Sequence, residues 1–143
     1  MTLKVSKVIL SAFIYETEDP ELIVGKIDRL LEGFNSNKSM RKVDGYYRTS
    51  IGIVEYVLEK KEASYFFKKI LKLLDKNDLY LLLATYNEKL DRSRLHLRFD
   101  KQKFIALDKL SLTDKGDVIK VIVSLNIYKN DSLIEELKQN VFN

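Results

Sequence analysis

Residues 94–99 alternate strictly between polar and large apolar side chains, and this alternation constrains the fold more than any other segment. Successive side chains of an extended strand point to opposite faces of a sheet. Leu95, Leu97 and Phe99 therefore form an apolar face that other parts of the chain must cover. The opposite face carries Arg92, Arg94, His96 and Arg98, and the basic residues Lys101 and Lys103 follow just beyond the strand. The pattern predicts a sheet that is covered on one face only.

The cationic face of this strand allows two interpretations. Arginine binds phosphate through paired hydrogen bonds and keeps its charge near neutral pH, so the strand is suited to a phosphate backbone. Lys120 lies on the corresponding face of a later strand and extends the surface if the two strands pair. Alternatively, the arginines pair with acidic residues on neighbouring strands and form an ordinary solvated sheet face.

Hydrophobic periodicity divides the rest of the chain into alternating strands and helices. Strands are expected at residues 5–15, 40–47, 51–60, 92–100 and 118–128, and helices at 20–34, 61–74, 78–90 and 132–142. The first strand is apolar on both faces, which predicts a central place in the sheet. A helical turn and a short extended piece are expected between residues 100 and 112. The order β-α-β-β-α-α-β-β-α predicts an α+β two-layer sandwich, with helices on one face of a mostly antiparallel sheet, in a single domain over residues 1–143.

Composition excludes several classes of function. The absence of cysteine removes disulfide scaffolds, thiolate metal sites and cysteine nucleophiles, and the single histidine makes a zinc site uncommon. We expect no cofactor. No apolar run approaches the roughly 20 residues that span a bilayer, and no signal peptide is evident, so a cytoplasmic location is expected. Residues 1–60 hold nine basic and nine acidic side chains, so the net charge of +4 comes from the part of the chain with the arginine strand.

Other patterns are weaker candidates for binding. The helix at 61–74 and the residues just after it present a lysine stripe, with Lys61, Lys68, Lys72 and Lys76 opposite the apolar side and Lys69 beside it. This stripe fits either a second phosphate-contacting surface or an ordinary solvated helix face. Tyr46 and Tyr47 could stack on unpaired bases or pack against the core.

Enzymatic interpretations have little support. His96 could act as a general base with Asp91 or Asp100, but Asp100 is four residues along the same strand, about 13 Å away. Glu16, Glu18 and Asp19 could bind a divalent cation for hydrolysis, although acidic residues at a helix start usually serve as caps. The glycines form no phosphate-binding loop. We expect a protein that is not an enzyme.

Three segments resemble a small archaeal family of RNA-binding proteins, also described as exosome subunits. They are Thr17-Glu18-Asp19-Pro20, Arg98-Phe99-Asp100-Lys101-Gln102 and Asp117-Val118-Ile119-Lys120-Val121. The resemblance implies RNA association, no catalysis and a fold similar to the ribosomal protein that holds 5S rRNA. One segment departs from the family pattern: this chain has Gly45-Tyr46-Tyr47-Arg48-Thr49-Ser50-Ile51 where relatives carry Gly-His-Tyr-Gly-Asn-Pro-Ile.

The sequence therefore predicts a protein that binds structured or double-stranded RNA through its cationic strand face and associates with an RNA-processing or exosome complex. The predicted contacts are Arg92, Arg94, His96, Arg98, Lys101, Gln102 and Lys103, with Lys68, Lys69 and Lys72 as a second site. For Asp100 and Gln102 a structural role is equally open, as a cap and as a partner for buried backbone groups. The alternative function is a protein-interaction module that docks an acidic partner without affinity for RNA.

Overall fold

Ten helices and strands follow one another in the computed structural model, which describes residues 5–44, 50–125, 135 and 137–140. In chain order they are β1 (Val5–Ile14), α1 (Pro20–Leu30), β2 (Asn37–Asp44), β3 (Ser50–Glu59), α2 (Lys60–Leu73), α3 (Lys76–Lys89), β4 (Leu90–Asp91), β5 (Arg94–Asp100), α4 (Lys101–Leu107) and β6 (Val118–Leu125).

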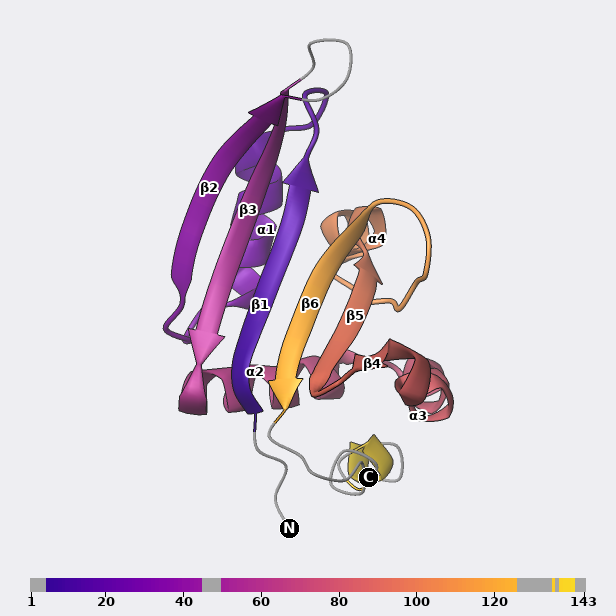
Figure 1. Ribbon diagram of the computed structural model, residues 1–143. Coiled ribbons are helices and arrows are strands. Elements are labelled where there is room, and N and C mark those ends of the chain that lie inside the picture. The colour runs from indigo at the N-terminus through magenta and orange to yellow at the C-terminus, as the bar shows by residue number, and fades with distance from the viewer. Residues whose placement is uncertain (1–4, 45–49, 126–134, 136, 141–143) are drawn as a thin grey trace.

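The strands form one antiparallel sheet in the order β2-β3-β1-β6-β5-β4 (Figure 1). The long β1 strand lies between β3 and β6, as its two apolar faces predicted. Pairing of β5 with β6 joins the arginine strand to the strand that carries Lys120. The predicted α+β architecture is confirmed, with helices on one side of an antiparallel sheet.

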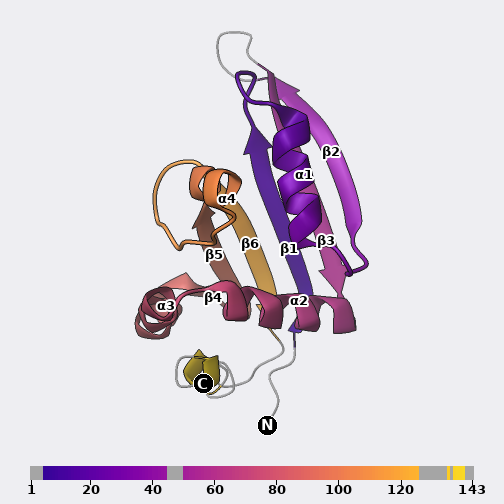
Figure 2. The same ribbon diagram turned by 180° about the vertical axis from the view of Figure 1, so that it is seen from behind.

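In Figure 1, α1, α2 and α4 lie behind the sheet and α3 lies beside its β4 edge. Figure 2 shows α1 along β1 and β3, with α2 crossing the strands near the start of β1. The core lies between the two layers. Inward-facing residues of the strands, such as Leu10, Leu58 and Val121, pack there against Ile27 and Phe66 of the helices, and all five are almost completely buried. Burial of this apolar surface is the main stabilising contribution to the fold.

Local sequence sets the helix starts. Asp19 caps α1 by accepting a hydrogen bond from the backbone N–H of Glu21, and Pro20 occupies the first turn, where its missing N–H costs nothing. The helix ends at Leu30, four residues before the predicted end, although Leu31 is still buried and Phe34 packs edge-on against Phe66.

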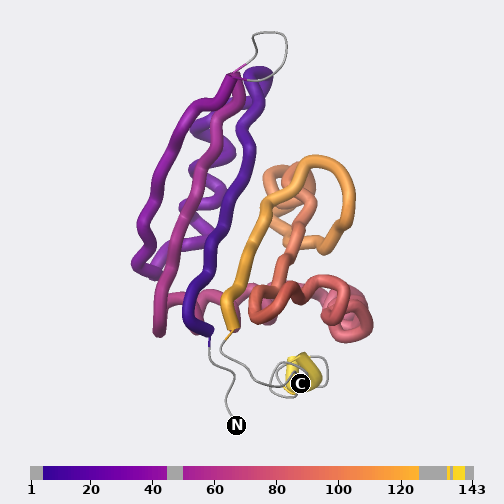
Figure 3. The backbone as a smooth tube through the Cα atoms, in the orientation of Figure 1, coloured from indigo at the N-terminus to yellow at the C-terminus, as the bar shows by residue number. Residues whose placement is uncertain are grey.

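The chain path divides the sheet into two halves (Figure 3). The first half consists of β1, β2 and β3 with α1, and the second of β4, β5 and β6 with α4, while α2 and α3 connect the two.

Arg92 lies in the two-residue turn between β4 and β5, at φ 58°, and not on the strand where the sequence placed it. The predicted turn after residue 100 is the two-turn helix α4, and the extended piece survives as a bridge between Phe99 and Leu112.

Some predictions fall outside the described residues. These are the tyrosine pair at 46–47, most of the segment that departs from the family pattern, and the greater part of the final helix. Residues 135 and 137–140 of that helix are helical, and Leu137 is buried in the core. Among the described helices, none is both long enough and apolar enough to cross a membrane.

Candidate nucleic-acid interface

The face of the sheet opposite the helices carries the cationic residues of β5. None of the described helices covers this side, which we call the open face (Figure 1). The strand register places side chains in rows across it. One row runs Arg98, Lys120, Ser11, Glu55 and Ser39, and the next contains Phe13, Ile53 and Arg41. Directly opposed side chains lie about 5 Å apart at Cβ, so each row is a continuous strip of surface.

The residues of β5 divide as the alternation predicted. Leu95, Leu97 and Phe99 have no exposed surface, whereas Arg94 and Arg98 are exposed and His96 is half-buried. Among the described residues, no ion pair joins these three side chains to an acidic group. Within the described part of the chain, these arginines therefore do not pair with acidic residues on neighbouring strands.

Acidic side chains nevertheless border the strand on its β4 side. A polar hollow of about 390 Å³ lies between His96, Arg98 and the acidic groups Glu88, Asp91 and Asp114. Asp114 lies 3.6 Å from Lys89, and Asp91 is the cross-strand neighbour of Arg94. Consequently the cationic character is strongest toward β6, where Arg98 and Lys120 are directly opposed.

The lysines of the proposed second site lie on α2, in the helical layer and away from the open face (Figure 2). Lys69 has a structural contact: its ammonium group donates to the carbonyl of Leu30 at 2.7 Å and lies 5.5 Å from the ring centre of Phe34. This contact satisfies a carbonyl at the end of α1. Lys72 is exposed and Lys68 half-buried, so only these two remain suited to binding.

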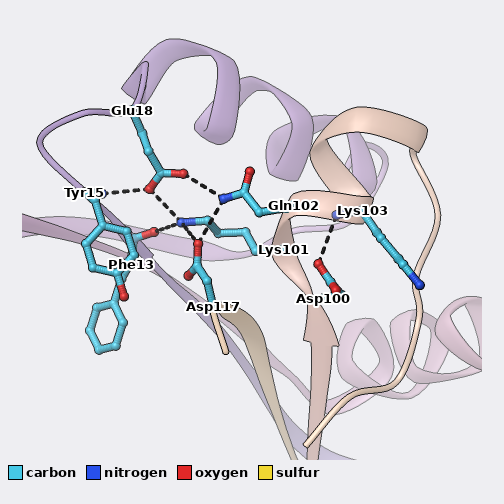
Figure 4. Close-up of polar contacts among 8 residues, drawn as sticks. All are labelled: Phe13, Tyr15, Glu18, Asp100, Lys101, Gln102, Lys103 and Asp117. Atoms are coloured by element: carbon cyan, nitrogen blue, oxygen red, sulfur yellow. Dashed lines mark hydrogen bonds and ion pairs between the residues drawn. The ribbon is translucent and has the colours of Figure 1, made fainter. Parts of the chain in front are cut away.

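Lys101 is not on the surface, and the prediction that it contacts phosphate is wrong. Its side chain has no exposed area, because Lys101 is the first residue of α4 and turns inward (Figure 4). Its three ammonium protons face three acceptors: Glu18 Oε1 at 2.8 Å, Asp117 Oδ2 at 2.8 Å and the carbonyl of Phe13 at 2.7 Å. The ammonium group also lies 4.9 Å from the ring centre of Tyr15. All hydrogen-bonding capacity of the buried cation is thus used.

Gln102 completes this cluster and Asp100 precedes it in the chain, and both have structural roles. The amide of Gln102 donates to Glu18 and to Asp117, each at 3.1 Å, so its partners are carboxylates rather than buried backbone groups (Figure 4). Asp100 caps α4 by accepting from the backbone N–H of Lys103. The Lys103 side chain is exposed and points away from the cluster.

The three sequence segments that carry the family resemblance meet in this cluster. Glu18 comes from the first segment, Lys101 and Gln102 from the second, and Asp117 from the third. The segments lie far apart in the chain, and the cluster joins the end of β1, the start of α4 and the start of β6. We call it the buried ion cluster. Much of the family pattern therefore serves the fold, while Arg98 and Lys120 of the same segments reach the open face.

The cluster changes the acid–base behaviour of Glu18. Burial by itself would raise the pKa of this carboxyl group, but hydrogen bonds from Lys101, the Tyr15 backbone N–H and Gln102 outweigh burial and hold the pKa below its usual range. A lowered pKa in the folded state means that the charged form of Glu18 stabilises the protein. This contribution is present above the pKa of an unfolded glutamate, about 4.3, and disappears as the pH falls through the lower folded value.

We therefore expect the free energy of unfolding to fall as the pH is lowered below about 4.3, with part of that fall caused by Glu18. Urea denaturation at a series of pH values measures it. Glu18→Gln should be less stable than the wild type at neutral pH and should lose less stability on acidification. Parallel pH profiles for the two proteins would contradict the assignment.

No three histidine, aspartate or glutamate side chains within the described ranges are grouped closely enough to hold a metal ion. Glu18 is bound to Lys101, and Asp19 caps α1. Two of the three carboxylates proposed for a metal-dependent hydrolase, Glu18 and Asp19, therefore have other roles in this structure.

The fold and this surface define an α+β protein whose antiparallel sheet has one face packed by helices and one face bearing cationic side chains. The model of a family described as RNA binding matches residues 7–125, and the chain belongs to this family.

Three relatives illustrate the similarity. The protein MJ0213 of Methanocaldococcus jannaschii is 27% identical over 143 residues, covering 94% of this chain and 93% of its own. The RNA-binding protein PAB1135 of Pyrococcus abyssi is 25% identical, covering 91% and 89%. The crystal structure of protein SSO0741 from Sulfolobus solfataricus has a TM-score of 0.85 and 39% identity, covering 95% of this chain and 97% of that one.

Proposed function

We propose that this protein binds structured or double-stranded RNA, without catalysis, through the open face of its sheet. The observation that carries the proposal is the direct opposition of Arg98 and Lys120 on the open face, in a chain that belongs to an RNA-binding family. Arg94 and His96 continue this surface along β5, Arg92 lies in the turn before this strand, and Lys103 is exposed in the first turn of α4 after it. Cations in such an arrangement contact phosphates and sugars and recognise shape more than sequence.

The proposal extends to association with an RNA-processing or exosome complex and to a fold related to the 5S rRNA-binding ribosomal protein. Its support is the resemblance of the three segments. Lys68 and Lys72 of α2, on the helical layer, are available as a second and weaker contact.

Docking of an acidic protein is a second candidate function, favoured by one specific observation. The open face carries apolar side chains among its cations: Phe13 is 48% exposed and Val43 is 43% exposed. Protein interfaces combine an apolar centre with a polar rim, and this face has both.

Photo-crosslinking identifies which face of the protein contacts RNA. Ultraviolet irradiation of the protein with a hairpin RNA, followed by mass spectrometry of the crosslinked peptides, should place the attached nucleotides on outward-facing residues of β1, β5 and β6. Peptides from α1 should remain unmodified. Crosslinks confined to the helical layer would show that RNA binds elsewhere, and an absence of crosslinks at saturating RNA would favour the protein-docking function.

A further inference from the structure

A second, shallow hollow on the open face lies beside the cationic strand and shares only Arg98 with the polar hollow near β4. It has a volume of about 300 Å³, and residues of all five long strands line it. Four of its lining residues determine its chemistry: Phe13, Glu55, Arg98 and Lys120. A hollow of this size on an otherwise continuous sheet is large enough for a flat group such as one nucleobase and too small for a folded segment of another protein.

Phe13 places an aromatic ring at this hollow with nearly half its surface exposed. It belongs to the outward set of β1, so the core does not require it. Its neighbour Tyr15 lies 6.4 Å away between ring centres, tilted by 52° (Figure 4). Because Lys101 covers one side of Tyr15, Phe13 is the better stacking platform of the two. An exposed aromatic ring on a sheet binds unpaired bases by stacking, and helical RNA keeps its bases inside.

Cations lie on both sides of this ring. Arg98 and Lys120 line the hollow from β5 and β6, and Arg41 lines it from β2. β2 and β5 are four strand spacings apart, so these charges span about 19 Å. None of the three takes part in an ion pair with another described residue. An aromatic platform between two separated cationic groups complements a base whose 5′ and 3′ phosphates extend to either side.

Glu55 provides the one acidic group of the hollow. It lies opposite Ser11 in the register, diagonal to Phe13, about 7 Å away at Cβ. An ionised carboxylate only accepts hydrogen bonds and repels phosphate, so it selects the edge of a base that offers donors. Guanine offers two adjacent donors, N1–H and the 2-amino group, which match the two oxygens of a carboxylate. Each of the other RNA bases offers donors at only one ring position or amino group on that edge.

We propose that the hollow binds one unpaired nucleotide of the RNA, with guanine preferred, stacked on Phe13 and hydrogen-bonded to Glu55. This inference rests on the proposed function and specifies which part of a structured RNA the open face recognises. Arg98 and Lys120 contact the phosphate on one side of the nucleotide and Arg41 the phosphate on the other.

The test compares four labelled RNAs by fluorescence anisotropy. Three are hairpins with the same stem and a loop that carries guanine, inosine or uracil at one position, and the fourth is the stem as a blunt duplex. Inosine lacks only the 2-amino group of guanine. The proteins are the wild type, Phe13→Leu, which keeps an apolar side chain without the ring, Phe13→Tyr, which keeps the ring, and Glu55→Gln.

The wild type should bind the guanine hairpin most tightly, with the inosine and uracil hairpins weaker. Phe13→Leu should lose about tenfold in affinity for the hairpins and none for the duplex, whereas Phe13→Tyr should bind like the wild type. Glu55→Gln should reduce the ratio of guanine to inosine affinity toward one. Circular dichroism and thermal melting check that all variants are folded, which is expected because both residues point away from the core.

Three kinds of failure are distinguishable. If the wild type binds hairpins and duplex equally, and Phe13→Leu changes neither, the nucleotide site is wrong while RNA binding stands. If the hairpins are preferred but guanine, inosine and uracil are equivalent, the assignment of Glu55 is overturned. If the wild type binds none of the four RNAs, both the nucleotide site and the proposed function fail, and the apolar side chains of the open face then indicate a protein partner.

Discussion

Replacing Lys101 with methionine is expected to destabilise the protein by about 3–5 kcal/mol, because it leaves two mostly buried carboxylates without their cation. Glu18 and Asp117 would face each other across the vacated position with side chains only 16% and 22% exposed. The carbonyl of Phe13 would lose its donor as well. One oxygen of Asp117 is already buried with no hydrogen-bond partner among the described residues, so the cluster has no spare donor to compensate.

Urea denaturation followed by circular dichroism measures this loss. The matched control combines Lys101→Met with Glu18→Gln and Asp117→Asn, which removes the uncompensated charges and retains side chains of similar size. This triple variant should recover most of the lost stability, since neutral amides can hydrogen-bond to each other. If Lys101→Met alone costs less than about 1 kcal/mol, the range of an exposed ion pair, the cluster does not hold the fold together as described.

Removing the cations of the open face is expected to have the second large effect. In the variant Arg94→Ala, Arg98→Ala, Lys120→Ala, the magnitude of the slope of log affinity against log salt should fall by roughly two to three, about one for each phosphate that the protein no longer neutralises. Affinity for a hairpin RNA at low salt should fall by more than about tenfold. All three residues have their side chains on the outer face, so stability should change little.

The control for this variant has the same change in charge on the other layer of the molecule. Lys61→Ala, Lys68→Ala, Lys72→Ala removes three positive charges from α2. If net charge alone governed binding, both variants would lose affinity equally. The open-face variant should lose much more, and equal losses would contradict the assignment of the binding surface. A loss confined to the α2 variant would assign the interface to the helical layer.

Much of the fold was predictable because local patterns and tertiary packing agree. The alternation in β5 and the two apolar faces of β1 each predicted a strand. The capping residues around Pro20 predicted the start of a helix. Boundaries were less certain. Arg92 continues the alternation of the strand, but the pairing of Leu90 with Leu95 makes residues 92 and 93 the turn of a hairpin, which depends on contacts that periodicity does not encode.

The candidate site was predictable on the strand and not beyond it. Arg98 and Lys120 were assigned to one surface because the alternation along each strand predicts on which face of the sheet its side chains lie. Pairing of β5 with β6 then brings the two residues together. Lys101 was misassigned because it directly follows the cationic strand, although its position in the alternation is that of the inward-facing Leu95, Leu97 and Phe99; as the first residue of α4 its side chain is buried. Its partners, Glu18 and Asp117, are brought to it only by the three-dimensional packing. The charged residues shared by the three family segments were the one available signal.

The exposed ring of Phe13 was missed for a related reason. The sequence of β1 is apolar on both faces, which correctly indicated a central strand but did not show which of its aromatic side chains stays exposed. In the structure no described helix covers the outer face. A buried aromatic and an exposed one have the same appearance in sequence, and only the arrangement of the layers distinguishes them.

The affinity of the wild-type protein for a short hairpin RNA, measured by fluorescence anisotropy over a series of salt concentrations, tests the central claim most directly. We predict micromolar or tighter binding near physiological salt, and an affinity that falls steeply and linearly on a log–log plot as salt increases. No binding at low salt, or binding that does not respond to salt, would contradict the view that the open face is an RNA-binding surface.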